Sequence, residues 1–98
     1  MFARVSTFQG GSGNTEDALR NVREQVLPAA EQLEGFAGML VLVGHDAGRT
    51  MSVTLWETEE QMRASEEAAN RLRSESAEAT GDEVVSVERF EVALDTTR

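Results

Sequence analysis

The sequence predicts an α+β fold in which a four-stranded antiparallel sheet carries two helices on one face. Four segments show the alternation or the continuous apolar run of a β-strand. Two further segments place apolar side chains three and four residues apart, which is the spacing of an amphipathic helix. The segments follow one another as strand, helix, strand, strand, helix, strand, an order typical of ferredoxin-like domains. At 98 residues the chain has room for one such domain, over residues 1–98, and for no second core.

Residues 2–8 form the first predicted strand, because apolar and polar side chains alternate along them. The glycine-rich stretch 10–13 then interrupts regular structure and is typical of a flexible connection. Asn14 or Thr15 is the expected N-cap of the first helix, since either side chain can accept a hydrogen bond from the first turn.

Pro28 lies inside the first helical pattern, which extends from Leu19 to Leu33. A proline has no N–H to donate to the carbonyl four residues earlier, and its ring crowds that carbonyl. We therefore expect the helix either to kink at Pro28 or to end near Leu27.

The rest of the chain is predicted to form two strands, a helix and a last strand. Residues 36–43 are nearly all apolar, which is typical of a strand covered on both faces. A hairpin connects them to residues 50–57, where apolar and polar side chains alternate. A capping box begins the second helix, predicted over residues 58–79, and residues 83–94 form the last strand.

One face of this sheet would carry no helix, although its strands are apolar. Residues 36–43 have apolar side chains on both faces, and Phe90, Val92 and Leu94 share one side of the last strand. An uncovered face of this kind would exceed the apolar patch of roughly 300–600 Å² found on soluble monomers. The same face of a second copy, related by a two-fold axis, would cover it. We therefore predict a homodimer through the sheet face.

Composition and charge exclude several classes of function. Nine arginines, no lysine and 18 acidic residues give a net charge of −9, the opposite of the basic surface that nucleic-acid binding requires. Without cysteine there is no thiolate metal site, and no grouping of His, Asp and Glu has the spacing of metal ligands. No apolar run approaches the roughly 20 residues of a membrane span, and no signal peptide is recognisable. We expect a cytoplasmic protein with no metal and with neither nucleic acid nor membrane as a partner.

Several short motifs resemble those of a known family, and they extend over nearly the whole chain. They are Val-Leu-Pro at residues 26–28, Gly35-Phe36 at the start of the second strand, Leu-Trp-Glu-Thr at residues 55–58 and Glu-Glu-Gln-Met at residues 59–62. Together with the order of strands and helices, they resemble the antibiotic-biosynthesis-monooxygenase-like family of the dimeric α/β-barrel superfamily. The resemblance implies the ferredoxin-like fold, a homodimer and a ligand cavity between the sheet and the helices of each subunit.

The resemblance also narrows the expected activity. The family includes cofactor-free oxygenases of phenolic polycycles or quinols, haem-degrading enzymes and members without known activity. Haem-degrading members use an Asn on the first strand and a Trp and a His on the second helix, and this sequence has none of them at those places. We therefore expect a cofactor-independent monooxygenase-like protein that acts on a small aromatic phenol or quinol. The alternative is a non-catalytic homodimer that binds a small molecule or has a structural role, which the absence of tyrosine favours.

The residues expected to line the ligand cavity come mainly from the third strand and the second helix. Trp56 ends the third strand, where it either packs in the core or forms a wall of the cavity. The side chains of the second helix that face the sheet are mostly small and partly polar. The helix therefore either packs closely on the sheet or leaves a void beneath it. This inward line comprises Met62, Ser65, Ala69, Leu72 and Ser76. The candidate ligand-binding residues are Trp56, Met62, Ser65, Leu72 and Arg89.

Arg4 and Arg89 lie in the middle of strands among apolar residues. An arginine that faces the interior needs an acid or an anionic ligand, because an unpaired buried charge is costly. Either side chain can bind an oxyanion, and Arg89 is the preferred candidate for a catalytic role. A pair with Glu88, Glu91 or an acid on the neighbouring strand is the simpler interpretation.

His45 is the other candidate for a catalytic role. It is the only histidine of the chain, and histidine is the side chain that changes charge near neutral pH. Its neighbour Asp46 could in principle orient it, as an acid orients the histidine of a general-base pair. Adjacent strand residues, however, point to opposite faces, and a hairpin tip is usually exposed to water. Isomerase or lyase chemistry through His45 would require its side chain to turn into a pocket.

Overall fold

The computed structural model of the protein describes residues 1–10, 15–46 and 48–97. Its elements are, in chain order, β1 (Phe2–Gly10), α1 (Thr15–Asn21), the π-helical turn η1 (Val22–Val26), α2 (Leu27–Glu31), β2 (Phe36–Gly44), β3 (Arg49–Trp56), α3 (Glu59–Ala64), α4 (Glu66–Thr80) and β4 (Asp82–Glu91). Most of the glycine-rich stretch, residues 11–13, and the side-chain cap predicted at Asn14 or Thr15 lie outside the part of the chain that is described.

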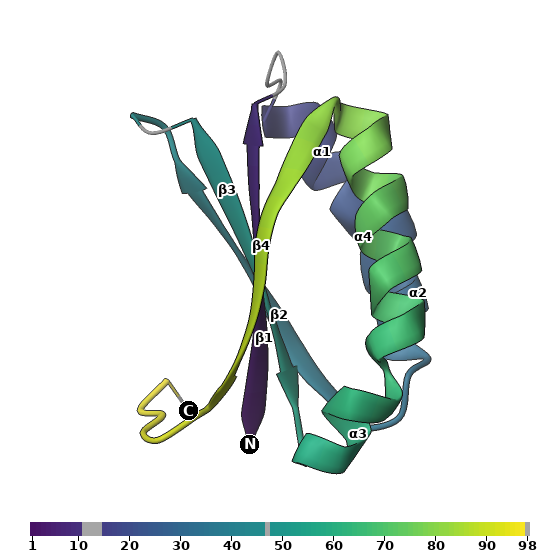
Figure 1. The fold of residues 1–98 in the computed structure, drawn as a ribbon, viewed down its shortest axis with the longest axis vertical. Coiled ribbons are helices and arrows are strands. Elements are labelled where there is room, and N and C mark those ends of the chain that lie inside the picture. Colours follow the sequence, from purple (N-terminus) through teal and green to yellow (C-terminus); the bar gives the residue numbers. More distant parts are fainter. Residues whose placement is uncertain (11–14, 47, 98) are drawn as a thin grey trace.

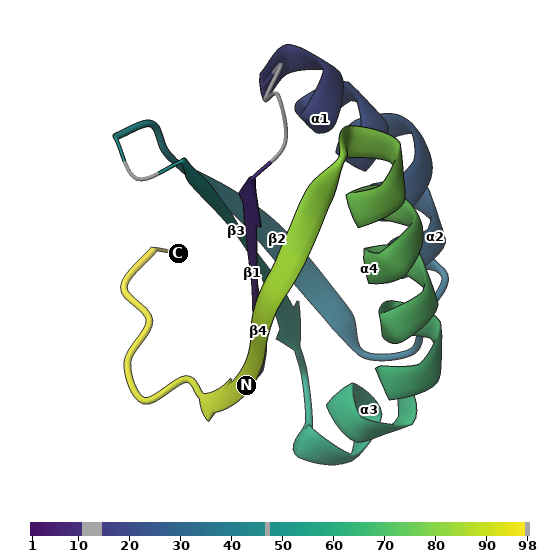
Figure 2. The same cartoon turned by 45° about the horizontal axis from the view of Figure 1, so that its top comes forward.

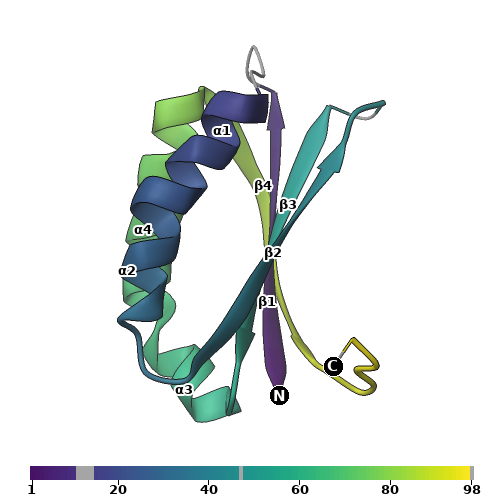
Figure 3. The same cartoon turned by 180° about the vertical axis from the view of Figure 1, so that it is seen from behind.

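The described strands form one antiparallel sheet in the order β2-β3-β1-β4, and the helices cover one of its faces (Figure 1). Seen from behind, α1, η1 and α2 form one helical rod that lies on the same side of the sheet as α4 (Figure 3). This arrangement confirms the predicted ferredoxin-like α+β fold. β4 ends at Glu91, short of the predicted end at residue 94, and the segment after it lies on the opposite side of the sheet from the helices (Figure 1).

Strand residues alternate between the helix-covered face and the open face of the sheet. The register pairs Ser6 of β1 with Ser52 of β3 and with Val87 of β4, and this row faces the helices. The open face carries Leu40 and Phe90, which are 54% and 49% exposed. The apolar strand β2 is therefore covered on one face within the described chain, whereas its residue pattern predicted cover on both faces.

The helical rod passes Pro28 without ending near Leu27, so the second of the two expected outcomes is wrong. In η1 the helix widens, and the N–H of Leu27 donates to the carbonyl of Val22, five residues earlier. A new α-helical segment begins at Leu27 and places Pro28 in its first turn. A missing N–H costs least where the regular bond to the carbonyl four residues earlier is already interrupted, as it is at the junction of η1 and α2. The widened turn thus lets the helix accommodate a proline.

The second helical region is interrupted at Ser65, whereas the sequence predicted one continuous helix over residues 58–79. Thr58 Oγ1 caps the start, accepting a hydrogen bond from the Gln61 N–H at 3.1 Å, but the return bond of the predicted capping box does not form, because the buried Gln61 Oε1 has no partner among the described residues. At the break, the carbonyl of Met62 accepts bonds from Ser65 Oγ and from Arg4 Nη2, both at 2.6 Å. A strand side chain therefore enters the hydrogen-bond ladder of the helix, which is a known cause of helix breaks.

The large apolar side chains of the core lie at one end of the space between the sheet and the helices. Trp56 is 1% exposed and Met62 is 2% exposed. The rings of Phe36 and Trp56 meet edge to face with their centroids 5.6 Å apart, an arrangement that aromatic pairs prefer. Because β3 ends at Trp56, this cluster occupies the end of the sheet from which α3 starts. The other end of the space is available for a cavity.

Replacing Gly35 with alanine should destabilise the protein by about 2–4 kcal/mol, for steric and backbone reasons. Gly35 has a φ of +85°, and an added Cβ would lie 2.2 Å from Gln61 Oε1 and 2.6 Å from Gln61 Cβ. Since the Cβ of Gln61 belongs to the first turns of α3, this helix would have to move. Urea unfolding measures the loss. The control Gly81→Ala also has a positive φ, +75°, but no atom within 4 Å, and should cost only about 1 kcal/mol. Equal losses in the two variants would contradict the steric explanation.

Candidate functional site

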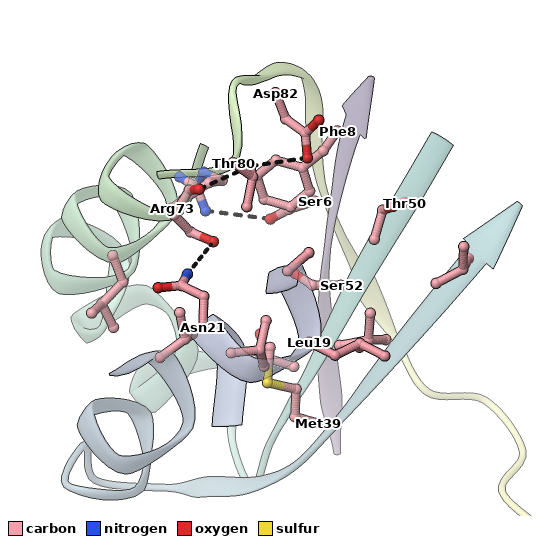
Figure 4. A pocket seen from close by; sticks show the side chains of 18 of the residues that line it. Ser6, Phe8, Leu19, Asn21, Met39, Thr50, Ser52, Arg73, Thr80 and Asp82 are labelled. Atoms are coloured by element: carbon pink, nitrogen blue, oxygen red, sulfur yellow. Dashed lines mark hydrogen bonds between the residues drawn. The ribbon is translucent and has the colours of Figure 1, made fainter. Parts of the chain in front are cut away.

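A cavity of about 560 Å³ separates the helices from the sheet (Figure 4). Its volume lies in the range of roughly 300–1,000 Å³ that is usual for small-molecule sites. The sheet contributes alternate residues of β1, β2 and β3, among them Ser6, Phe8, Met39 and Ser52, and the first residue of β4, Asp82. The helical rod and α4 contribute Leu19, Asn21, Val22, Val26, Ala30, Ala69, Leu72, Arg73, Ser76, Ala79 and Thr80.

The cavity has a buried end and an exposed end. Arg4, Trp56 and Arg73 line it and are at most 9% exposed. His45 and Arg49, next to the β2–β3 hairpin, also line it and are exposed. Figure 2 shows this hairpin and the start of α1 at the same end of the sheet. In the described part of the chain, a ligand would therefore enter beside the hairpin and reach Trp56 last.

Short side chains keep the space between α4 and the sheet open. The strands present Ser6, Ser52 and Thr54 to the cavity, and α4 presents Ala69 and Ser76. None of these side chains is long enough to fill the space between the two layers. The sequence was compatible with both close packing and a void, and the structure has the void.

Arg4 links the sheet to the helices at the buried end. Its Nη2 donates to the Met62 carbonyl at 2.6 Å and to Ser65 Oγ at 2.9 Å, and lies 3.1 Å from Glu66 Oε1. Its Cζ lies 5.4 Å from the centre of the Trp56 ring, a cation–π distance. Burial lowers the pKa of Arg4 and the charge of Glu66 opposes this shift, so that the guanidinium stays charged at physiological pH. Its contacts with three elements make Arg4 a structural link.

Glu66, the first residue of α4, balances two arginines. Arg89 binds it with two parallel bonds, Nε at 2.6 Å from Oε1 and Nη2 at 2.7 Å from Oε2, while Arg4 shares Oε1. Hydrogen bonding from Arg89, together with the charge of Arg4, lowers the pKa of Glu66 to about 2, against the opposing effect of burial. The acid that pairs with Arg89 therefore comes from a helix, and is neither Glu88 nor Glu91.

Arg73 of α4 lines the cavity and was not predicted from the sequence. It is 9% exposed, and its Nη1 donates to Ser6 Oγ at 3.4 Å across the cavity (Figure 4). Its Nη2 donates to Asn70 Oδ1. Burial in the first place, and then the charge of Arg4, lower the pKa of Arg73. The available signal was its spacing, because Arg73 follows Ala69 by four residues on the inward line of the helix.

Two of the five predicted ligand-binding residues, Trp56 and Leu72, line the cavity. Met62 and Ser65 are buried at the break between α3 and α4, and Arg89 is 43% exposed beside its partner acid. These three do not belong to the described cavity wall. A role in ligand binding stays a prediction for all five residues.

The rest of the described chain offers no metal centre. Over residues 1–10, 15–46 and 48–97, no three His, Asp or Glu side chains are grouped so that they could hold a metal ion. Over the same residues, no helix combines the length and the apolar character needed to cross a membrane.

Replacing Glu66 with glutamine should lower the free energy of unfolding at neutral pH by about 2–4 kcal/mol, because the buried Arg4 loses its counter-charge. Folding lowers the pKa of Glu66 from 4.5 to about 2, so its contribution is complete above pH 4.5 and is lost as the pH falls towards 2. Urea unfolding of both proteins over this pH range should show the difference shrinking. The exposed neighbour provides the control, since Glu67→Gln should have little effect. A difference that stays constant down to pH 2 would disprove the role of the carboxylate.

No protein-family model matches the sequence. Two uncharacterised proteins of Mycobacterium tuberculosis are similar to it: Rv2557 is 34% identical over 93 residues and Rv2558 is 31% identical over 94 residues. The matches cover 95% and 96% of this chain, but 41% and 39% of the two relatives. The chain thus spans about two fifths of the length of the curated relatives it matches.

Several solved structures have the same fold. SnoaB, a cofactor-independent oxygenase from Streptomyces nogalater, has a TM-score of 0.71 at 13% identity, over 99% of this chain and 97% of that chain. The heme degrader MhuD of Mycobacterium tuberculosis, with two hemes bound in its active site, has a TM-score of 0.70 at 21% identity, over 98% and 99%. A dimeric ferredoxin-like protein from an uncultured marine organism has a TM-score of 0.68 at 13% identity, over 100% of both chains. At these identities the similarity is one of fold, and the chain has the ferredoxin-like fold of the antibiotic-biosynthesis-monooxygenase-like proteins.

Proposed function

We propose that the protein is a cofactor-independent monooxygenase-like enzyme that binds a small aromatic phenol or quinol between its sheet and its helices. The cavity is the observation that carries this proposal. Trp56 supplies an aromatic surface at its buried end, Val22 and Leu72 supply apolar walls, and Ser52 and Thr54 supply hydroxyl groups for a substrate oxygen. The similarity of fold to SnoaB, a cofactor-independent oxygenase, supports it.

The proposed reaction needs no external reductant, as the oxidation of an anthrone illustrates. The methylene carbon of the anthrone becomes the carbonyl carbon of a quinone. One atom of O₂ becomes the carbonyl oxygen, and the other leaves as water with both hydrogens of the methylene group. The substrate itself supplies all the electrons that reduce O₂. What the protein must do is stabilise the anion that forms on proton loss and keep bulk water away from it.

His45 is the candidate for removing the substrate proton, since it lines the exposed end of the cavity. The same exposure favours the alternative, a non-catalytic protein that binds a small molecule in this cavity, because a histidine in contact with water is poorly held for proton transfer. The chain has no tyrosine that could replace it.

Oxygen uptake should be detectable when the purified protein, without metal or flavin, is given a panel of anthrones, naphthols and quinols. Ala69→Phe, which fills the cavity from α4, should reduce uptake by at least about tenfold, because the aromatic ring takes the place of the substrate. Ala64→Phe adds the same ring at an exposed position and should leave uptake unchanged. Full activity of Ala69→Phe would place the chemistry outside the cavity. No uptake with any compound, compared with heat-denatured protein, would favour the non-catalytic alternative.

The open face of the sheet supports a second part of the proposal, a homodimer. Leu40 and Leu42 of β2 and Phe90 of β4 are about half exposed, and Leu94, in the segment that follows β4 on this side of the sheet, is 82% exposed. Apolar side chains gathered on one face need cover, and a second copy supplies the same face across a two-fold axis. The fold similarity to a dimeric ferredoxin-like protein agrees with this assembly.

Replacing Leu40 with aspartate should convert the dimer to a monomer in sedimentation equilibrium at micromolar concentration, because the substitution places a charge in the apolar contact. The control Gln32→Asp adds the same charge at an exposed position next to α2, on the helix side of the molecule, and should leave the dimer intact. A wild-type protein that sediments as a monomer, or a dimer that survives Leu40→Asp, would argue against an interface through the sheet.

A further inference from the structure

We propose that the cavity binds its ligand as an organic anion, with a carboxylate or phenolate oxygen held by the guanidinium of Arg73 and the hydroxyl of Ser6. The inference rests on the proposed function, because it concerns the same cavity, and it names the charge of the ligand and the residue that selects it. Neither residue was among the candidates derived from the sequence.

Arg73 is a buried cation that faces the cavity. Its side chain comes from the middle of α4, lines the cavity and is 9% exposed. The guanidinium has five N–H groups, and the described side chains that accept from it are Ser6 at 3.4 Å and Asn70. The bond to Ser6 is at the long limit of a hydrogen bond. A planar oxyanion beside Ser6 would accept two shorter, charge-assisted bonds from the same guanidinium.

The charges around the cavity are mostly paired with one another, but no described carboxylate is in contact with Arg73. Three arginines influence one another here, Arg4, Arg73 and Arg89, and Glu66 is the carboxylate that offsets them. Glu66 forms its ion pairs with Arg4 and Arg89. Among the described residues no carboxylate lies within ion-pair distance of Arg73. Glu66 therefore acts on Arg73 only from a distance, and a buried cation without a carboxylate in direct contact is costly. An anionic ligand would supply that contact.

The two acids in the cavity wall have other partners. Asp17 pairs with Arg20 at 3.4 Å, outside the buried end. Asp82 accepts a hydrogen bond from Thr80 at 3.1 Å. Neither reaches Arg73, so the anion site is not occupied by a described side chain of the protein itself.

The distance from Ser6 to the aromatic end indicates the size of the ligand. Ser6 is paired with Ser52, and Trp56 lies four residues farther along β3, a separation of roughly 13 Å. A ring system of two or three fused rings fits this length when its oxyanion lies at Arg73 and its far edge meets Trp56. Aromatic carboxylates and ionised phenols of that size are the ligand class that this geometry selects.

The test compares an anion with its neutral isostere, 2-naphthoate with 2-naphthamide, by isothermal titration calorimetry in a buffer free of phosphate at neutral pH. The wild-type protein should bind the naphthoate about 10- to 100-fold more tightly than the amide, and Arg73→Gln should abolish this preference. Arg73→Lys should retain part of it. The matched control is Arg71→Gln, which removes the same charge from an exposed position on α4 and should leave the preference unchanged.

Two further readouts separate ligand binding from a structural role. Trp56 is the only tryptophan, so its single indole N–H resonance reports whether naphthoate enters the cavity. The melting temperature of unliganded Arg73→Gln should not fall below that of Arg71→Gln, because replacing Arg73 removes the cost of burying its charge. A clear fall would assign Arg73 to the fold and overturn the proposal, as would equal affinity for the two naphthalenes or failure of both to bind. Oxygen uptake from a neutral anthrone tests the proposed enzyme separately, so the two ideas can fail independently.

Discussion

The contact of Arg4 with the break between α3 and α4 is the interaction on which the rest of the structure depends. The guanidinium extends from β1 towards the helices, donates to the Met62 carbonyl and is neutralised by Glu66 at the start of α4. A buried cation tolerates little displacement, because each lost contact exposes an unsatisfied donor in a poorly polarisable surrounding. The contact therefore determines both where the second helix breaks and how far α4 lies from the sheet at that end.

The cavity follows from this constraint and from the size of the neighbouring side chains. With one end of α4 tied to the sheet through Arg4, the small residues Ala69 and Ser76 cannot draw the helix closer along its length. On the helical rod of α1, η1 and α2, the first and last residues of the π-helical turn, Val22 and Val26, line the same cavity. Such turns are frequent at functional sites because they displace side chains without breaking the helix. The cavity thus depends on two backbone features, the break before α4 and the π-helical turn η1, and does not result from one missing side chain.

How much of this could be predicted from the sequence depends on the range of each interaction. Alternation and helical spacing are local, so the order of the strands and helical regions and the Thr58 half of the capping box were predicted correctly. The break at Ser65 was missed because its cause, Arg4, lies about 60 residues earlier in the chain. Arg89 was correctly expected to need an acid, but its partner comes from a helix and cannot be found by strand register. Arg73 was overlooked because a charged helical residue is usually solvated.

The distribution of charge explains how an acidic protein can select an anion. The net charge of −9 comes mostly from exposed carboxylates. At physiological salt, their repulsion of an anionic ligand is screened beyond a Debye length of about 8–10 Å. Among the charged residues of the cavity wall, Arg4 and Arg73 are the buried ones, and their surrounding screens them far less than water does. Attraction of an anionic ligand would therefore act at contact and not as long-range steering. In such a site, selectivity depends on the geometry at Arg73 and Ser6, and the overall charge of the protein affects mainly the rate of encounter.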